Sequence, residues 1–433
     1  MNIPNRPKRR DVRVNRPERT QVEMRFLALD QMLDDDHRAR IVWQFVESLD
    51  LELLYARFKV VPGESGRNAI APEILLGLWL MATIDSISSA RELARRTTTD
   101  IPYMWLCGGV SVNHHTLSDF RSLNGEFFEK MLVDTVTAMM QEGFVTFETL
   151  GHDGMRVRAN AGSSSFRRKP TLQELHQQAK QHVESLREES EDTSKQLEHD
   201  ARRKAARQRA AQQRADRIGE ALRQVEALHE QKEKRKNGDG EKARCSTTDP
   251  DARKMKMADG GFRPAYNFQL TTEGKSRMVV AVDVTNSGSD RGELAPRYQQ
   301  VQETYSVTPG KLLVDSAFAI KEDVTEVERS GTEVVSTIYQ EEAMRKHGRD
   351  PYERKPGDSD EFANFRQRMS RADYQAIYKQ RPSIAEFPNA EFRNRGCHQL
   401  PVRGLERVKS VALLLANAFN LMRMWDLRSR ATV

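Results

Sequence analysis

The chain has 433 residues, enough for two or three domains, and carries a formal net charge of +6 with a pI of about 9.1. This length excludes a single small module, and the basic balance favours a polyanionic partner. Cys107, Cys245 and Cys397 lie far apart, which argues against a disulfide framework or a C-x-x-C zinc site. The longest apolar run, residues 410–422, is too short to span a bilayer, so we expect a soluble, cytoplasmic protein.

Residues 1–20 form a basic arm. They contain seven Lys or Arg and two acids, so 7 minus 2 gives +5 of the net charge of +6. The segment is rich in Pro and has no periodicity, so we predict a disordered arm in which Arg9 and Arg10 contact phosphates. A solubilising tail without a fixed partner is the alternative.

Residues 21–143 have the pattern of a helical domain, with a weak signal for DNA binding. A short basic helix at residues 88–96 is followed by a turn at Gly108-Gly109 and a further helix near Thr116. Helix, turn and helix is the order of a major-groove reader, although most helical hairpins are only bundle elements. The residues predicted to contact DNA here are Arg91, Arg95 and Arg121.

The period changes to that of strands in residues 144–170. Asp153 lies within a stretch rich in β-branched and aromatic residues, where a carboxylate is costly to bury unless it is paired or binds a cation. An exposed turn between Gly151 and Gly154 is the alternative for this position.

Residues 171–242 interrupt the strand pattern. Two long charged helices are predicted up to about Glu233, with a break at residues 188–194 that lets them form an antiparallel hairpin, followed by a linker. The contact between the two helices, here called the seam, is predicted to be thin because Ala replaces larger residues. For the charged face of the hairpin, a solvated spacer is the favoured interpretation.

Strands return in residues 243–430 and alternate with helical runs, which predicts a mixed sheet covered by helices. Asp315 follows an apolar strand, at the carboxyl end where functional side chains gather, although an ordinary helix N-cap is the alternative. Asp283, within another apolar strand, is a fallback ligand. Residues 339–374 lack periodicity, and we predict a mobile loop over the site.

The segment from Tyr378 to Met424 pairs a charged rim with a buried helix. Glu386 and Arg393 lie seven residues apart, which puts them on one face of a helix. Pro382 places Glu386 just inside a helix that starts there or on a kinked helix. Apolar residues recur at spacings of three and four from residue 405 to residue 422, which predicts the buried helix that lies under the charged rim.

These blocks together resemble the DDE-type transposases of bacterial insertion sequences, from Val22 onwards. The similarity lies in Tyr378-x-x-Arg381 followed by Glu386 and Arg403-Gly-Leu, and in the blocks that contain Asp153 and Asp315. Two departures are Ser410, where relatives often have an acid, and the Ser-Ala that follows Asp315.

The resemblance implies an α/β protein with mixed α+β character: an RNase H-like sheet with flanking helices, interrupted by the helical hairpin and preceded by an all-helical domain. It places Asp153 on the first strand, Asp315 after the fourth and Glu386 on a following helix. These three acids are then the catalytic residues and the ligands of two Mg²⁺ ions, with Mn²⁺ as a substitute. The further residues implied to hold DNA are Tyr378, Arg381, Arg393 and Arg395.

The implied function is that of a bacterial, nucleoid-associated transposase. It binds the terminal inverted repeats of its element, cleaves the ends and joins the 3′-hydroxyls to target DNA by phosphoryl transfer. The implied assembly is a homo-oligomer, a dimer in the simplest case, without a membrane partner. A catalytically inactive DNA-binding protein that keeps the fold is the alternative.

Deleting residues 1–20 tests the basic arm. Each lost phosphate contact removes about 0.9 from the slope of log affinity against log salt, so the deletion is expected to flatten the salt dependence of DNA binding. The dissociation constant of a duplex, measured across a salt series, checks this. An unchanged slope would identify a tail without a phosphate contact.

Overall fold

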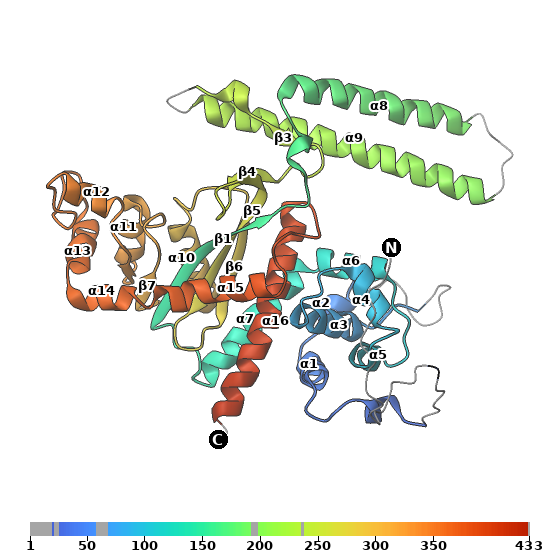
Figure 1. Ribbon diagram of the computed structural model, residues 1–433, viewed down its shortest axis with the longest axis horizontal. Coiled ribbons are helices and arrows are strands. Elements are labelled where there is room, and N and C mark those ends of the chain that lie inside the picture. Colours follow the sequence, from blue (N-terminus) through green and yellow to red (C-terminus); the bar gives the residue numbers. More distant parts are fainter. Residues whose placement is uncertain (1–19, 21–25, 58–67, 192–197, 235–237, 432–433) are drawn as a thin grey trace, which may run out of the picture.

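The structure, a computed structural model, describes residue 20 and residues 26–57, 68–191, 198–234 and 238–431. A β-sheet lies near its centre, with a group of short helices to one side and a long helical hairpin above (Figure 1). Arg9, Arg10 and the rest of the predicted arm up to residue 19 lie outside the described residues.

The N-terminal part is entirely helical within its described residues. Its elements are η1 (Leu29–Met32), α1 (Arg38–Glu47), α2 (Glu52–Tyr55), α3 (Pro72–Ile84), α4 (Ala90–Arg96), α5 (Ile101–Cys107), α6 (His114–Leu123) and α7 (Gly125–Gln141). The helices predicted at residues 88–96 and near Thr116 are present as α4 and α6, and a further helix that was not predicted, α5, lies between them. Pro102 in its first turn starts α5, and Gly108, with a φ of 54°, ends it.

The sheet has the strand order β6-β5-β1-β7-β8. Strand β4 pairs with the first residues of β5, before the part of β5 that pairs with β6. The bounds are β1 (Thr149–Arg158), β4 (Arg253–Lys256), β5 (Phe262–Glu273), β6 (Val279–Thr285), β7 (Lys311–Leu313) and β8 (Glu333–Val335). Strand β5 is antiparallel to β1 and β6, whereas β1, β7 and β8 run parallel. This arrangement agrees with the expected RNase H-like fold, in which β7 is the fourth strand of the five-stranded core.

The helices that follow the core strands include a segment predicted to be a loop. They are α10 (Leu294–Tyr305), α11 (Lys321–Arg329), α12 (Glu341–Lys346), α13 (Asp360–Met369) and α14 (Ala372–Tyr378). The prediction of a mobile loop at residues 339–374 is wrong, because α13 packs on α11 and β8. Its apolar residues Phe362, Phe365 and Met369 recur at spacings of three and four and are buried.

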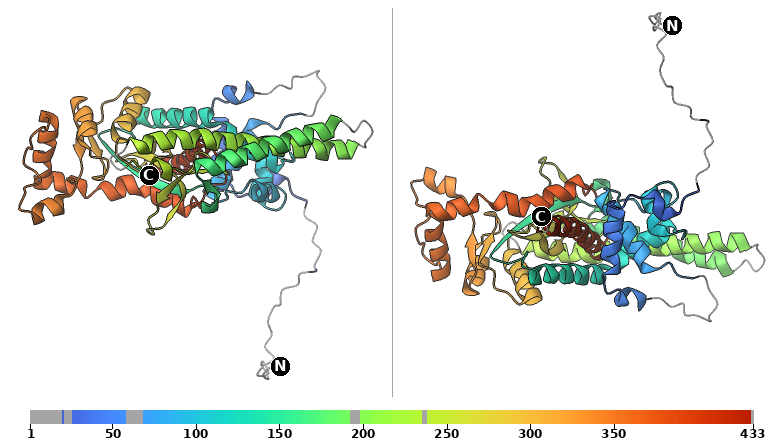
Figure 2. Two further views of the ribbon diagram at one scale, coloured as in Figure 1. Left: turned by 90° about the horizontal axis from the view of Figure 1, so that it is seen from above. Right: turned by 90° about the horizontal axis from the view of Figure 1, so that it is seen from below.

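The charged insertion forms the expected hairpin of α8 (Lys169–Glu191) and α9 (Glu198–Glu233). It projects beyond the sheet on the side of the N-terminal helices (Figure 2). Its base is closed by the short strands β2 (Phe166–Arg167) and β3 (Cys245–Ser246), flanked by the turns η2 (Ser163–Ser165) and η3 (Gly240–Lys242).

The chain ends in η4 (Pro382–Glu386), α15 (Phe387–Asn394) and α16 (Leu405–Ala431). The segment η4 is a π-helical turn that begins at Pro382 and runs directly into α15, so Glu386 lies just inside a helical segment that starts there, which is one of the two predicted alternatives. Helix α16 is buried from Val408 to Leu421 along most of its faces, because α3, α6 and α7 pack on it from one side and β6 from another.

Gly151 allows the close approach of β1 and η4. A Cβ added at Gly151 would lie 2.7 Å from Ile384 Cγ2 and 3.0 Å from the backbone nitrogen of Ala385. We expect Gly151→Ala to destabilise the protein by about 1–3 kcal/mol, because η4 must shift. Urea denaturation measures this.

The matched control is Gly288→Ala, where the nearest atom to the added Cβ, Met255 Cγ, is 3.5 Å away. Equal stability losses in the two variants would contradict a tight contact between β1 and η4.

Candidate active site

Asp153 lies in the middle of β1, opposite Leu270 of β5, and is half-buried. Its Oδ2 accepts a hydrogen bond of 2.8 Å from Asn389 Nδ2. Asn389 belongs to α15, three residues after Glu386, and is 4% exposed. The strand and the C-terminal helix are therefore joined at the predicted acid, and Asp153 is not an exposed turn residue.

Asp315 and Glu386 approach the same end of β1. Asp315 lies two residues after β7, whose Leu313 pairs with Gly151 of β1. Its Oδ1 accepts from the backbone nitrogen of Ala317 at 2.7 Å, so it orders the turn after the strand. Glu386 ends the π-helical turn and is exposed.

Arg381 connects the acids. Its Nη1 donates to Glu386 Oε1 at 2.8 Å, and its Nη2 lies 3.9 Å from Asp315 Oδ2. The guanidinium is almost completely buried, and its Nε has no hydrogen-bond partner among the described residues. Asp315 and Glu386, the two acids that do not belong to β1, thus share one buried cation, the guanidinium of Arg381.

The electrostatics of Asp153 reflect this crowding. Burial raises the pKa of its carboxyl group from the usual value of 3.8 to about 7. The positive charge of Arg381 opposes the increase in pKa, whereas the negative charges of Asp315 and Glu386 add to it. A further positive charge nearby would therefore stabilise the ionised form of Asp153, as expected for a carboxylate that binds a cation.

A cleft of about 740 Å³, here called the acid cleft, opens beside Asp153 and Asp315. Glu386 does not line it, and within the described part of the chain no three Asp, Glu, His or Cys side chains form a ready-made metal cluster. Arg381 accounts for this geometry, because its guanidinium lies between Glu386 and Asp315. The oxygen donors nevertheless fit a hard divalent cation, since the crowded carboxylates need charge compensation.

The acid cleft also has a basic rim. Its charged and polar lining residues are Arg156, Arg158, Lys256, Asp259, Arg263, Asp290, Arg393 and His398. Arg156 and Arg263 are paired with Asp290 and Asp259. Arg158, Lys256 and Arg393 are exposed, so they face solvent beside the acids.

Sequence reasoning missed several of these residues. Asn389 had a usable signal, because it lies one helical turn after Glu386. Asp290, which accepts hydrogen bonds from Asn267 and Gln269 at 2.7 and 3.3 Å, follows a Ser- and Gly-rich loop that carries no comparable signal. The fallback ligand Asp283 lies elsewhere, since it pairs with Arg297 and is 3.8 Å from Lys409.

The residues predicted to contact DNA fall into two groups. Arg91 and Arg95 on α4 are exposed, although Arg95 is held by Glu92, and Arg393 is exposed at the cleft. Tyr378 is half-buried at the end of α14. These four side chains have a surface that a phosphate can reach.

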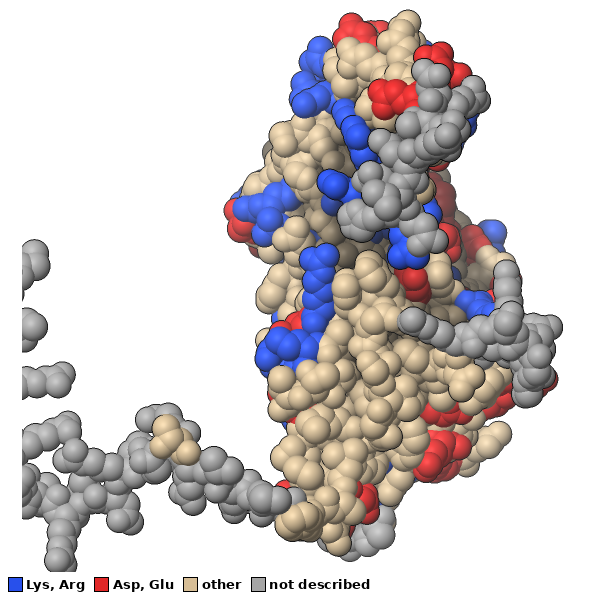
Figure 3. Space-filling model, turned by 90° about the vertical axis from the view of Figure 1, so that its right-hand side faces the viewer, with Lys and Arg blue, Asp and Glu red and all other residues tan. Residues whose placement is uncertain are grey.

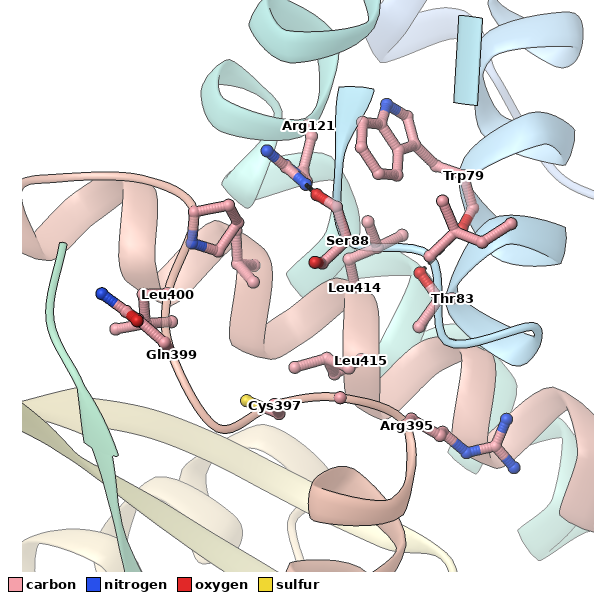
Figure 4. Close-up of a pocket in the computed structure, with 14 residues that line it drawn as sticks. Trp79, Thr83, Ser88, Arg121, Arg395, Cys397, Gln399, Leu400, Leu414 and Leu415 are labelled. Carbon is pink, nitrogen blue, oxygen red and sulfur yellow. Dashed lines mark hydrogen bonds between the residues drawn. The ribbon is translucent and has the colours of Figure 1, made fainter. Parts of the chain in front are cut away.

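Arg121 and Arg381 are buried, and Arg395 is half-buried. Arg121 is 4% exposed, stacks on Trp79 at 4.3 Å and donates to the backbone oxygen of Ser88, and burial lowers its pKa to about 10 (Figure 4). Arg395 points away from Arg121, and burial lowers its pKa as well. The prediction that Arg121 contacts DNA is not supported, because its guanidinium packs between α3 and α16.

Replacing Asp153 tests the raised pKa. The pKa of Asp153 is higher in the folded state than in the unfolded state. Ionisation of Asp153 therefore lowers the free energy of unfolding of the wild type as pH rises from about 4 to about 7. Without divalent cations we expect Asp153→Asn to be more stable than wild type at pH 8, by up to about 4 kcal/mol, with the gain vanishing near pH 4. Thermal unfolding across pH measures the difference.

Asp259→Asn is the control, because Asp259 lines the same cleft but its pKa is lowered by Arg263. It should give no gain at pH 8. Added Mg²⁺ should raise the melting temperature of wild type more than that of Asp153→Asn, by mass action. A stability difference for Asp153→Asn that does not change with pH would contradict the assigned pKa.

Two family models match separate parts of the chain. Residues 27–123 match a family described as a transposase domain (DUF772), and residues 239–421 match the transposase DDE domain family. The second range contains Asp315 and Glu386, whereas Asp153 lies between the two matches. No curated protein and no solved structure gave a match. The two family matches, one on the helical domain and one on the sheet, show that the chain belongs to the DDE-type transposases of insertion sequences.

Proposed function

We propose that this transposase cleaves the ends of its element and joins the exposed 3′-hydroxyls to target DNA at the acid cleft. The observation that carries the proposal is the meeting of Asp153, Asp315 and Glu386, from three distant parts of the sequence, around Arg381.

The three carboxylates are the proposed ligands of two Mg²⁺ ions, with Mn²⁺ as a substitute. Such ions activate the attacking hydroxyl and neutralise the phosphate in an in-line displacement. Asn389 keeps Asp153 Oδ2 in place through its hydrogen bond. Arg381 compensates Asp315 and Glu386 before cations bind and then donates to a DNA phosphate.

DNA follows the exposed basic groups in this proposal. Arg158, Lys256 and Arg393 at the rim of the cleft hold the strand that is cut, since guanidinium and ammonium groups contact phosphate oxygens without reading sequence. Arg91 and Arg95 on α4 extend this contact to the terminal inverted repeats, and Tyr378 and Arg395 flank Arg381 along the chain.

The proposed division of labour follows the fold. Residues 1–20 are the basic arm, and residues 21–143 bind the element's ends. Residues 144–170 and 243–430 carry out the reaction, whereas residues 171–242 are the insertion. We propose that the protein acts as a homo-oligomer, a dimer in the simplest case, in the cytoplasm at the nucleoid. Among the described helices, none combines the length and the apolar character needed to cross a membrane.

One observation favours a second candidate, a catalytically inactive DNA-binding protein. Arg381 lies between Asp315 and Glu386, and the described acids do not form a ready-made cluster of three ligands. In an inactive protein this ion-paired arrangement would be the permanent state, and the basic surfaces would bind DNA without cutting it.

Glu386→Gln separates the two candidates. The change keeps the shape and the hydrogen bond from Arg381 but removes the charge that a cation needs. We expect metal-dependent nicking of a supercoiled plasmid that carries the element's ends to fall by more than about 100-fold, because even outer partners of metal ligands account for about 10–100-fold. DNA binding and the melting temperature should stay close to wild type.

The control is Glu391→Gln, five residues further along the chain in α15, where the side chain lies 3.8 Å from Arg395 and is not paired with Arg381 as Glu386 is. It should cleave nearly as wild type does. Loss of cleavage in Glu391→Gln but not in Glu386→Gln would show that the third acid is misassigned. An inactive wild type under both Mg²⁺ and Mn²⁺ would favour the DNA-binding candidate.

A further inference from the structure

One face of the inserted hairpin consists of arginines and small or uncharged residues. At about 100° per residue, six arginines of α9 fall within an arc of about 160° that lies beside the seam with α8. They are Arg202, Arg203, Arg207, Arg209, Arg214 and Arg217. The residues between them on this arc are Ala206, Ala210 and Gln213, so an extended polyanion can approach the helix closely. We call this surface the arginine face.

The seam lies on a different side of α9. Gln208 Nε2 donates to the backbone oxygen of Leu186 at 2.9 Å, and Ala211, Ala215 and Ile218 are buried against α8. The arginine face is therefore not needed to hold the two helices together. Five of its arginines are exposed, and only Arg217, nearest the sheet, is half-buried.

The arginine face is not held by ion pairs within the described residues, although Asp216 lies close enough to Arg217 to oppose the lowering of its pKa. The ion pairs within the described part of the hairpin are Lys169 with Glu226 and Arg223 with Glu220, both nearer the sheet. Across the described residues, none of the six arginines has an ion pair. Seen from the free end of the hairpin, Lys and Arg side chains gather along one side of the upper half of the molecule (Figure 3). Six positive charges within about 22 Å repel one another unless an anion binds.

The arginine face leads towards the acid cleft. Arg217 lies close enough to Arg403 for this arginine to lower its pKa, after the larger effect of burial, and its Nε has no hydrogen-bond partner among the described residues. Arg403 Nε donates to the backbone oxygen of Asn160 at 3.0 Å. Asn160 comes two residues after Arg158, which lines the cleft. Basic groups thus continue from the hairpin to the rim of the cleft.

We propose that the arginine face binds the phosphate backbone of duplex DNA outside the cleft, independently of sequence. This rests on DNA being the substrate and adds a second contact surface to it. A row of guanidinium groups fits phosphates along a groove, whereas a protein partner would also require apolar anchors, which the alternation of Arg, Ala and Gln does not offer. The insertion is then a DNA clamp and not a solvated spacer.

A charge-matched pair of full-length variants tests the clamp. The first carries Arg202→Gln, Arg209→Gln and Arg214→Gln on the arginine face. The second carries Lys180→Gln, Arg187→Gln and Lys234→Gln, which removes three positive charges from exposed positions on or next to the same hairpin but off this face. Circular dichroism checks that both keep their helical content.

The measurement is the dissociation constant of a linear duplex without element sequence, taken by fluorescence anisotropy across a salt series without divalent cations. Three lost phosphate contacts should reduce the slope of log affinity against log salt by about 2.7 in the first variant, and the second should change it by less than about 0.9. Equal slopes in the two variants overturn the clamp, because net charge alone then explains the effect.

Two further outcomes distinguish the failures. If the first variant shows the control's slope but sediments as a different oligomer, the arginine face is a contact between copies of the chain, and the clamp is overturned. If wild type binds no duplex at all, the proposed DNA function fails along with the clamp. Because no cleavage is measured, an inactive acid cleft does not affect the result.

Discussion

Helix α16 is the element on which both halves of the molecule depend. It is buried between the sheet and the N-terminal helices, so its polar side chains must find partners inside the core. Asn420 accepts from the backbone nitrogen of Val279 and donates to its oxygen, which continues the edge of β6, and Asn417 donates to the oxygen of Phe128 in α7. Helix α16 is therefore hydrogen-bonded both to β6 and to α7. This fixes the orientation of the helical domain relative to the acid cleft.

The acid cleft depends on a second constraint, the contact between β1 and the π-helical turn η4. Only a glycine at position 151 lets Ile384 and Ala385 lie against the strand, and this contact brings Glu386 and Asn389 beside Asp153. At the two ends of this π-helical turn, Arg381 is buried whereas Glu386 is exposed. The site is thus assembled by backbone packing, and Arg381 compensates the charge that this packing creates.

Local periodicity explains which parts of this arrangement the sequence predicted. Apolar strands, the long charged helices and an Asp placed after a strand are patterns within a few residues, and β1, β7 and the hairpin were predicted from them. Residues 339–374 were misjudged because α13 buries Arg366, which pairs with Asp358 and interrupts the apolar pattern. Arg121 was assigned to DNA because basic residues usually face solvent, and the ring of Trp79 that covers its guanidinium comes from another part of the chain.

The base of the insertion shows why a helical hairpin at this point can take part in the reaction. Phe166 and Arg167 of β2 pair with Ser246 and Cys245, and a small core of the hairpin's own residues, including Cys245 and Val225, continues this contact. The hairpin is therefore anchored between the end of β1, which carries Asp153, and the start of β4, which borders the cleft. Because a rigid helix transmits the orientation of its base, the arginine face keeps a defined direction relative to the acids over the length of α9. A DNA duplex held on that face would enter the cleft at one angle, which favours an in-line approach of the reacting groups.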